Sequence, residues 1–235
     1  AGQWSQVCGV YDGQRLLLYV NGLLAATQPF TGRINATASL LHIGRCGGDA
    51  RCEGRSFLGA LDEVLLLDRP LSPLEVRAYH DSRRPWGTPL LAEMQPDADD
   101  LRVLEDGRPI PFETEGALPL ADQAADLDGH VLAYWPLDGD AQELTGSWTS
   151  TNHGATAGEG RFGPDSGGMA FDGTQWVDSG LSLQPGAGGS FTIELWAKIP
   201  VGAGAGRGLV FFGTDMNGGD RSELHFTSYP DVRIY

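Results

Sequence analysis

Aromatic side chains and polar side chains occur together in the second half of the chain, a combination suited to binding sugar rings. An aromatic face packs on the apolar face of a sugar while neighbouring polar groups bond its hydroxyls. Polar partners are available in or near the same loops at Asn152, Asp215, Asn217 and Asp220. The alternative is that each aromatic ring packs at the edge of the core. The candidate ligand-binding residues are Trp148, Trp176, His225 and Tyr229.

The sequence offers little for catalysis. Asp62 and Glu63 are adjacent in an apolar run, and adjacent residues of a strand point to opposite faces, so we expect no acid–base pair from them. There is no Gly-x-Ser-x-Gly motif, and the five histidines do not have the spacing of metal ligands. Composition alone leaves a Ser-His-Asp triad open. We predict no catalytic residues and a protein that is not an enzyme.

Two of the three cysteines, Cys46 and Cys52, flank a glycine-rich loop and are predicted to close a small disulfide. Such a bond fits an exported protein. Cys8 lies between apolar residues, so we expect it to be a buried free thiol.

The charge of the chain restricts its partners. With 31 acidic and 16 basic residues the net charge is -15, which disfavours nucleic acid and anionic lipid surfaces. The acidic excess leaves room for calcium, although most carboxylates are expected to be solvated. No apolar run is long enough to span a membrane, so we expect no membrane insertion. Neither a signal peptide nor an initiator methionine begins the sequence, and we expect a piece of a longer protein.

Short strands joined by tight turns dominate the expected secondary structure. The 34 glycines and 14 prolines suit such an all-β chain. Asp12-Gly13 and Asn21-Gly22 are hairpin signals on either side of the apolar run 15–20. Alternation in 190–199 predicts a half-buried strand. Further strands are expected at 32–35, 39–44, 59–67, 130–137, 168–171, 176–178, 208–212, 223–226 and 232–235.

One helix and one linker interrupt the strands. Ser72, Pro73 and Glu75 form a capping box, which predicts a helix from Pro73 to about Asp81. Residues 83–129 are rich in proline, alanine and carboxylates, and they are predicted to be an acidic linker. A lone strand at 101–104 is an open alternative within it.

Two parts of the sequence resemble the laminin-G-like, concanavalin-A-like jelly-roll family. Residues 1–82 resemble the C-terminal half of such a domain, through Trp4-x-x-Val-x-Gly-Val-Tyr-Asp-Gly and Gly59-x-Leu-Asp-Glu-Val64. Residues 130–235 resemble the N-terminal half, through Tyr134-Trp-Pro-Leu-Asp138, Phe171-Asp-Gly173 and Ser190-Phe-Thr-Ile-Glu-Leu-Trp196. The resemblance implies an all-β, two-sheet antiparallel jelly-roll sandwich with one short helix.

The order of the halves leaves several arrangements open. The C-terminal half of one repeat followed by the N-terminal half of the next is the order of a slice from a tandem array, which we take as the origin of the sequence. Each half alone would expose a large apolar face. We therefore expect the halves to close onto each other in circularly permuted order, within one chain or as a domain-swapped homodimer.

The resemblance also implies a function and an ion. Family members often hold a structural calcium, for which Asp62 and Asp138 are the candidate ligands, with Asp172 and the carbonyl of Gly173 as additions. The alternative is that these carboxylates make turn or edge-strand hydrogen bonds. We expect a non-catalytic binding or adhesion module of a secreted or cell-surface protein, with a glycan or a surface protein as ligand. A spacer repeat without a ligand and a glycoside hydrolase are the alternatives.

Overall fold

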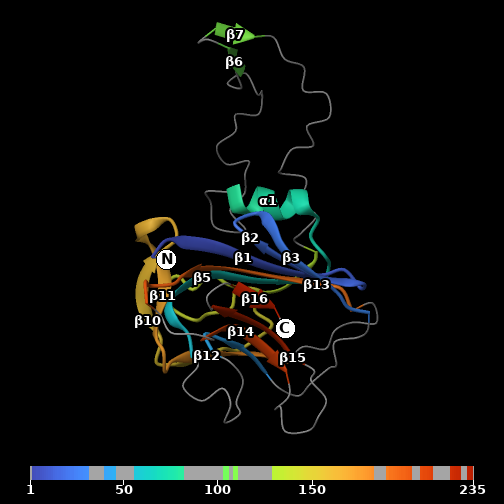
Figure 1. The fold of residues 1–235 in the computed structure, drawn as a ribbon. Coiled ribbons are helices and arrows are strands. Elements are labelled where there is room, and N and C mark those ends of the chain that lie inside the picture. Colours follow the sequence, from blue (N-terminus) through green and yellow to red (C-terminus); the bar gives the residue numbers. More distant parts are fainter. Residues whose placement is uncertain are drawn as a thin grey trace.

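Two antiparallel β-sheets and one short helix make up most of the molecule (Figure 1). The computed structural model describes residues 2–31, 40–45, 56–81, 103–105, 108–110, 129–182, 189–202, 207–213, 223–228 and 232–234. Among them, no helix is long and apolar enough to cross a membrane. The predicted all-β, two-sheet fold is confirmed and is consistent with a concanavalin A-like sandwich.

The two sheets differ in size. The larger has eight strands, in the order β10 (Thr156–Gly160), β11 (Gly163–Asp172), β5 (Leu58–Leu67), β13 (Phe191–Lys198), β1 (Trp4–Tyr11), β2 (Arg15–Val20) and β3 (Leu23–Pro29), with β8 (Val131–Trp135) also paired to β5. The smaller has six, in the order β16 (Val232–Ile234), β15 (Glu223–Ser228), β14 (Arg207–Gly213), β4 (Leu40–Ile43), β12 (Trp176–Ser182) and β9 (Thr151–His153). Within the expected linker, β6 (Val103–Glu105) and β7 (Arg108–Ile110) form a separate ladder.

Each sheet contains strands from both ends of the sequence. In the larger sheet β13 lies between β5 and β1, and it is paired along most of its length on both sides. In the smaller sheet β4 lies between β12 and β14. Backbone hydrogen bonds therefore connect residues 1–82 with residues 130–235 in both layers. How this arrangement relates to a tandem array stays a prediction.

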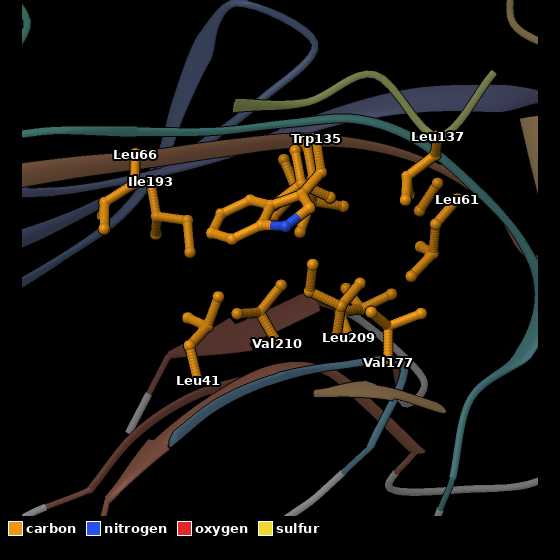
Figure 2. Packing of buried hydrophobic residues seen from close by; sticks show 14 of the residues in the cluster. Leu41, Leu61, Leu66, Trp135, Leu137, Val177, Ile193, Leu209 and Val210 are labelled. Carbon is orange, nitrogen blue, oxygen red and sulfur yellow. The ribbon is translucent and has the colours of Figure 1, made fainter. Parts of the chain in front are cut away.

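The main core fills the space between the sheets. Trp135 of β8 is fully buried there, and Figure 2 shows its indole ring between Leu66 and Ile193 of the larger sheet and Leu41 and Val210 of the smaller one. Complete burial of a leucine, isoleucine or valine side chain contributes about 2 kcal/mol to stability through removal of apolar surface from water. The core therefore depends on residues from both ends of the chain.

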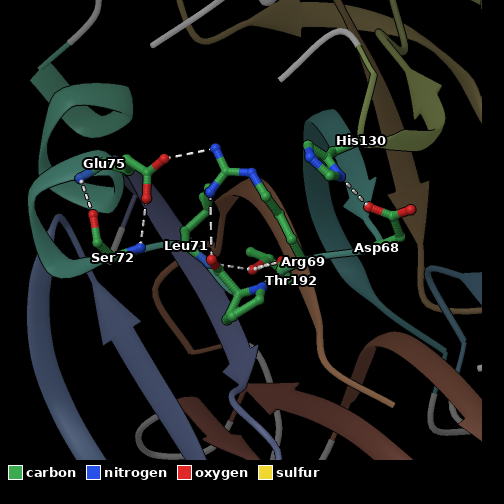
Figure 3. Close-up of polar contacts among 8 residues, drawn as sticks. Asp68, Arg69, Leu71, Ser72, Glu75, His130 and Thr192 are labelled. Carbon is green, nitrogen blue, oxygen red and sulfur yellow. Dashed lines mark hydrogen bonds and ion pairs between the residues drawn. The ribbon is translucent and has the colours of Figure 1, made fainter. Parts of the chain in front are cut away.

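Helix α1 (Pro73–Asp81) covers the outer face of the larger sheet (Figure 1). The predicted capping box is confirmed: the Glu75 backbone N–H donates to Ser72 Oγ at 3.3 Å, and the Ser72 backbone N–H donates to Glu75 Oε2 at 2.7 Å (Figure 3). Val76 of α1 is buried between the helix and the sheet, in a second apolar cluster with Tyr19 and Leu65. The cap fixes where the helix starts, and Val76 fixes which side faces the sheet.

The prediction that 190–199 forms a half-buried strand was wrong in one respect. Seven of the eight residues of β13 are buried, so both of its faces are covered. Thr192, on the outer face, accepts a hydrogen bond from the Leu71 backbone N–H at 2.9 Å (Figure 3). The outer face of Trp196 is covered by His80 of α1, stacked at 5.7 Å between ring centroids. The alternating residues of β13 therefore pack on two different partners, the smaller sheet on one face and α1 with its preceding segment on the other, and neither face is exposed to solvent.

Turn signals located the hairpins well. Asn21 and Gly22 both have positive φ angles, 50° and 74°, and join β2 to β3 as their sequence predicts. The short strands β9 and β10 were not predicted, and β3 was predicted only through the hairpin signal that precedes it. The strand expected at 32–35 and the disulfide expected between Cys46 and Cys52 lie outside the described residues. Cys8 is buried and free, as predicted.

Candidate functional site

The outer face of the smaller sheet carries a cluster of polar and aromatic side chains, which we call the Asp178 cluster: Arg45, His42, His153, Trp176 and Asp178. Val177 is buried in the core, so its neighbours Trp176 and Asp178 point to the opposite face of β12. Asp178 lies opposite His42 of β4, and Trp176 lies opposite His153 of β9. The register of three strands therefore brings these residues together.

The Asp178 carboxylate is the centre of the cluster. Its Oδ1 is 2.6 Å from His42 Nδ1 and 3.0 Å from Trp176 Nε1, and its Oδ2 is 2.8 Å from His153 Nε2. An ionised carboxylate only accepts hydrogen bonds, so each of these nitrogens acts as a donor. In neutral imidazoles the other ring nitrogen, His42 Nε2 or His153 Nδ1, is then an acceptor.

Burial and hydrogen bonding act in opposite directions on the titrating groups. Burial alone would raise the pKa of Asp178, but the hydrogen bonds from His42 and His153 outweigh it and hold the pKa below its ordinary value. For His42, burial lowers the pKa, and it outweighs the opposing effect of Asp178. At neutral pH the cluster therefore contains an ionised Asp178 and a neutral His42.

Trp176 is held between two side chains. The His153 ring stacks on it with 4.4 Å between centroids and 15° between planes, and Arg45 Cζ lies 4.3 Å from its centroid. The imidazole and the guanidinium both lie against the indole, so a ligand would meet the edges of this stack and its polar groups.

The three other predicted ligand-binding residues have different outcomes. Trp148 packs against the main core and donates its indole N–H to the Leu132 carbonyl at 3.2 Å. The backbone of His225 lies opposite Phe211, which lies opposite His42. Tyr229 lies outside the described residues. Their roles in binding stay predictions.

Sequence reasoning missed Asp178, His42, His153 and Arg45 as members of a site. A signal was present in the alternation of Trp176-Val-Asp178 and of Leu41-His-Ile43, which puts the polar residues of two strands on one face. What the sequence lacked was the pairing of β4 and β9 with β12.

The residues proposed for calcium are spread over two places. Asp62 is 1% exposed, and its Oδ2 accepts the backbone N–H of Arg161 at 2.7 Å. Burial raises its pKa to about 7, and the neighbouring charge of Asp138 acts in the same direction. Asp172 instead accepts hydrogen bonds from Thr174 in an exposed turn that includes Gly173. Within the described ranges no group of three or more His, Cys, Asp or Glu side chains is arranged to hold a metal.

The expectation that Asp62 and Glu63 point to opposite faces was wrong. Glu63 has a φ of 54°, which breaks the alternation of β5 where its pairing with β13 shifts register. Glu63 Oε1 accepts the hydroxyl of Tyr134 at 3.0 Å, and its Oε2 lies 3.4 Å from Arg161 Nη2. Both carboxylates thus approach Arg161. Both are also buried, so neither is presented to a substrate in this conformation.

Comparison with known families supports the fold. A search of curated proteins and a search of solved structures gave no match. Residues 1–77 match the family Laminin_G_3, described as the concanavalin A-like lectin/glucanases superfamily.

Proposed function

We propose that the chain is a non-catalytic binding module of a secreted or cell-surface protein, and that it binds a neutral glycan at the Asp178 cluster. The observation that carries this proposal is the convergence of Arg45, His42 and His153 around one partly exposed indole. Glycan sites combine an aromatic residue with a few fixed polar groups. The match of residues 1–77 to a superfamily that includes lectins supports the same class of function.

The chemistry of the cluster favours a ligand rich in hydroxyl groups. The guanidinium of Arg45 carries several N–H donors beside the indole, and these can bond the hydroxyl groups of a sugar. Asp178 already accepts three hydrogen bonds, and its role is to orient the two imidazoles. The chain's net charge of -15 disfavours acidic glycans.

The arrangement does not favour hydrolysis. Glycoside hydrolysis ordinarily needs two carboxyl groups on either side of the scissile bond. The cluster contains one carboxylate, and three donors occupy it. We therefore retain the proposal that the protein is not an enzyme.

A glycan array tests the proposal, with binding constants then measured for the best ligand. Arg45→Gln removes the charged donor, and Asp178→Asn frees the imidazoles to change tautomer. We expect each to weaken binding by about tenfold or more, which corresponds to about 1.4 kcal/mol. Asp68→Asn is the matched control, because Asp68 also pairs with a histidine, His130 at 2.7 Å, at an exposed position outside the cluster.

Three outcomes would contradict the proposal. No glycan binding at high protein concentration would favour a spacer repeat or a protein ligand. Binding that Arg45→Gln and Asp178→Asn leave unchanged would move the site elsewhere, with Trp148 and Tyr229 as the next residues to test. Hydrolysis of a polysaccharide would refute the non-catalytic assignment.

A further inference from the structure

Two amide side chains lie beside the Asp178 cluster, and they differ in how much of their hydrogen-bonding capacity the protein uses. Asn152 precedes His153 and Gln175 precedes Trp176, and Trp176 lies opposite His153 in the pairing of β12 with β9. Each amide has a carbonyl oxygen that accepts hydrogen bonds and an NH₂ group that donates them. A group that the protein leaves unused is available to a ligand.

Asn152 uses both ends of its amide within the protein. Its Nδ2 donates to the Ala155 carbonyl at 2.8 Å, and its Oδ1 accepts the Ala155 backbone N–H at 2.8 Å. These two bonds close the turn that carries His153. The role of Asn152 is therefore to hold this turn.

Gln175 uses only one end of its amide. Its Oε1 accepts the Asp172 backbone N–H at 3.1 Å, in a turn where Asp172 Oδ1 also accepts the Thr174 backbone N–H at 2.9 Å. Within the described ranges no protein group accepts a hydrogen bond from Gln175 Nε2. Because the amide is planar, the bond at Oε1 also fixes the direction of the two N–H groups. Ordering a glutamine side chain costs up to about 2 kcal/mol, and here the turn orders it before a ligand arrives.

Gly154 leaves space beside the Gln175 amide. Its φ angle is 93°, in a region that favours glycine. In the described structure, a Cβ at this position would contact Gln175 alone, with Cγ at 3.5 Å and Nε2 at 4.0 Å. Gly154 directly follows His153, so the space adjoins the stack of His153 on Trp176. A sugar at the edge of the stack can therefore reach the Gln175 N–H groups.

We propose that Gln175 is a specificity-determining residue of the Asp178 cluster, and that its amide N–H groups donate to one hydroxyl oxygen of the bound sugar. The inference rests on the proposed function, because it concerns the same ligand. Gln175 is a neutral donor with a fixed direction, whereas Arg45 is a charged donor beside the indole. A site that bonds a particular hydroxyl discriminates against the analogue that lacks it. Gln175 therefore selects among neutral glycans.

An array of neutral glycans that includes their monodeoxy analogues tests this role. We expect the wild type to bind a parent sugar about tenfold more tightly than the analogue that lacks the hydroxyl bonded by Gln175. Gln175→Met keeps an unbranched side chain but removes the amide, and it should abolish this difference between the two sugars. Arg45→Gln should weaken the binding of both sugars and preserve the difference.

Two controls separate recognition from the structure of the turn. Thr174→Val removes the hydrogen bond from Thr174 Oγ1 to Asp172 Oδ1, 2.7 Å long, and leaves the Gln175 amide in place. Gln142→Met makes the same substitution at an exposed glutamine that is distant in sequence. Both variants should discriminate between the two sugars as the wild type does. Melting temperatures of all variants establish that each one is folded.

The outcomes distinguish this inference from the proposed function. Discrimination that Gln175→Met leaves unchanged, or that Thr174→Val abolishes equally, would overturn the role of Gln175. So would a wild type that binds every deoxy analogue as tightly as its parent sugar. In each of these cases weaker binding by Arg45→Gln would still support the Asp178 cluster as the site. A wild type that binds no glycan would overturn both proposals.

Discussion

The buried carboxyl of Glu194 makes the stability of this fold depend on pH in an uncommon direction. Glu194 lies on β13 beneath α1 and is 5% exposed. Its Oε1 accepts a hydrogen bond from Gln6 Nε2 at 2.8 Å, whereas its Oε2 has no hydrogen-bond partner among the described residues. Burial raises its pKa from 4.5 to about 7, despite the opposing effects of Gln6 and Arg161.

The sign and the size of the effect follow from this shift. Between about pH 4.5 and pH 7 the unfolded chain has lost this proton while the folded chain still holds it, so rising pH favours the unfolded state. The contribution is fully present below pH 4.5 and is lost as the pH rises through 7. The difference between a pKa of 4.5 in the unfolded chain and about 7 in the folded chain corresponds to about 3 kcal/mol of unfolding free energy. Asp62, whose pKa is raised to about 7, acts in the same direction.

The perturbation is Glu194→Gln, which keeps the shape and the acceptor for Gln6 but cannot ionise. Its amide leaves a buried donor unpaired, at a cost of about 1–3 kcal/mol that does not depend on pH. The informative quantity is therefore the unfolding free energy of the variant minus that of the wild type. A cost that does not depend on pH cancels when this difference is compared between two pH values. We expect that difference to move in favour of the variant by about 3 kcal/mol between pH 4.5 and pH 8.

Urea denaturation at several pH values, followed by tryptophan fluorescence, measures these free energies. Glu159→Gln is the control, because it makes the same substitution at a half-exposed carboxylate that is paired with Lys198 at 3.0 Å, and pairs of this exposed kind contribute little to stability. A difference for Glu194→Gln that does not change between pH 4.5 and pH 8 would refute the reasoning. So would a shift in favour of the wild type.

Three further predictions concern the cap, the core and the proposed ion. Ser72→Ala removes the acceptor for the Glu75 N–H and should lower the unfolding free energy by about 1 kcal/mol in urea denaturation, whereas no loss would contradict the role of the cap. Leu66→Ala opens a cavity beside Trp135 and should cost about 2–5 kcal/mol in the same assay, and a cost below about 1 kcal/mol would contradict the packing described. If calcium binds at Asp62 it must displace the proton held there, so calcium should raise the melting temperature more at pH 8 than at pH 6 and not at all in Asp62→Asn. An equal rise in Asp62→Asn would exclude this carboxylate as a ligand.

Local sequence signals predicted the local structure of this chain. Asn21-Gly22 located a hairpin because positive φ angles suit these two residues. Ser72 and Glu75 located the first turn of the helix because their side chains bond each other's backbone N–H groups. The family resemblance supplied the two-sheet architecture, which no local signal contains.

Features that depend on contacts distant in sequence escaped prediction. The burial of Trp196 depends on α1, and the convergence of Asp62 and Glu63 depends on one positive φ angle at a register shift. The Asp178 cluster needs β4, β9 and β12 in one register, and these strands are far apart in the sequence. Sequence reasoning therefore found Trp176 but not the residues that surround it.

The position of β13 between β5 and β1 constrains how the chain acquires its fold. β1 and β5 leave the ribosome before the strand that joins them, which begins only at Phe191. At roughly 5–20 residues per second, the first strands wait on the order of ten seconds for this partner. During that time β1 and β5 lack β13, and closure must then form contacts of high sequence separation, which is a slow step. The nascent chain should therefore depend on chaperones more than its size alone suggests.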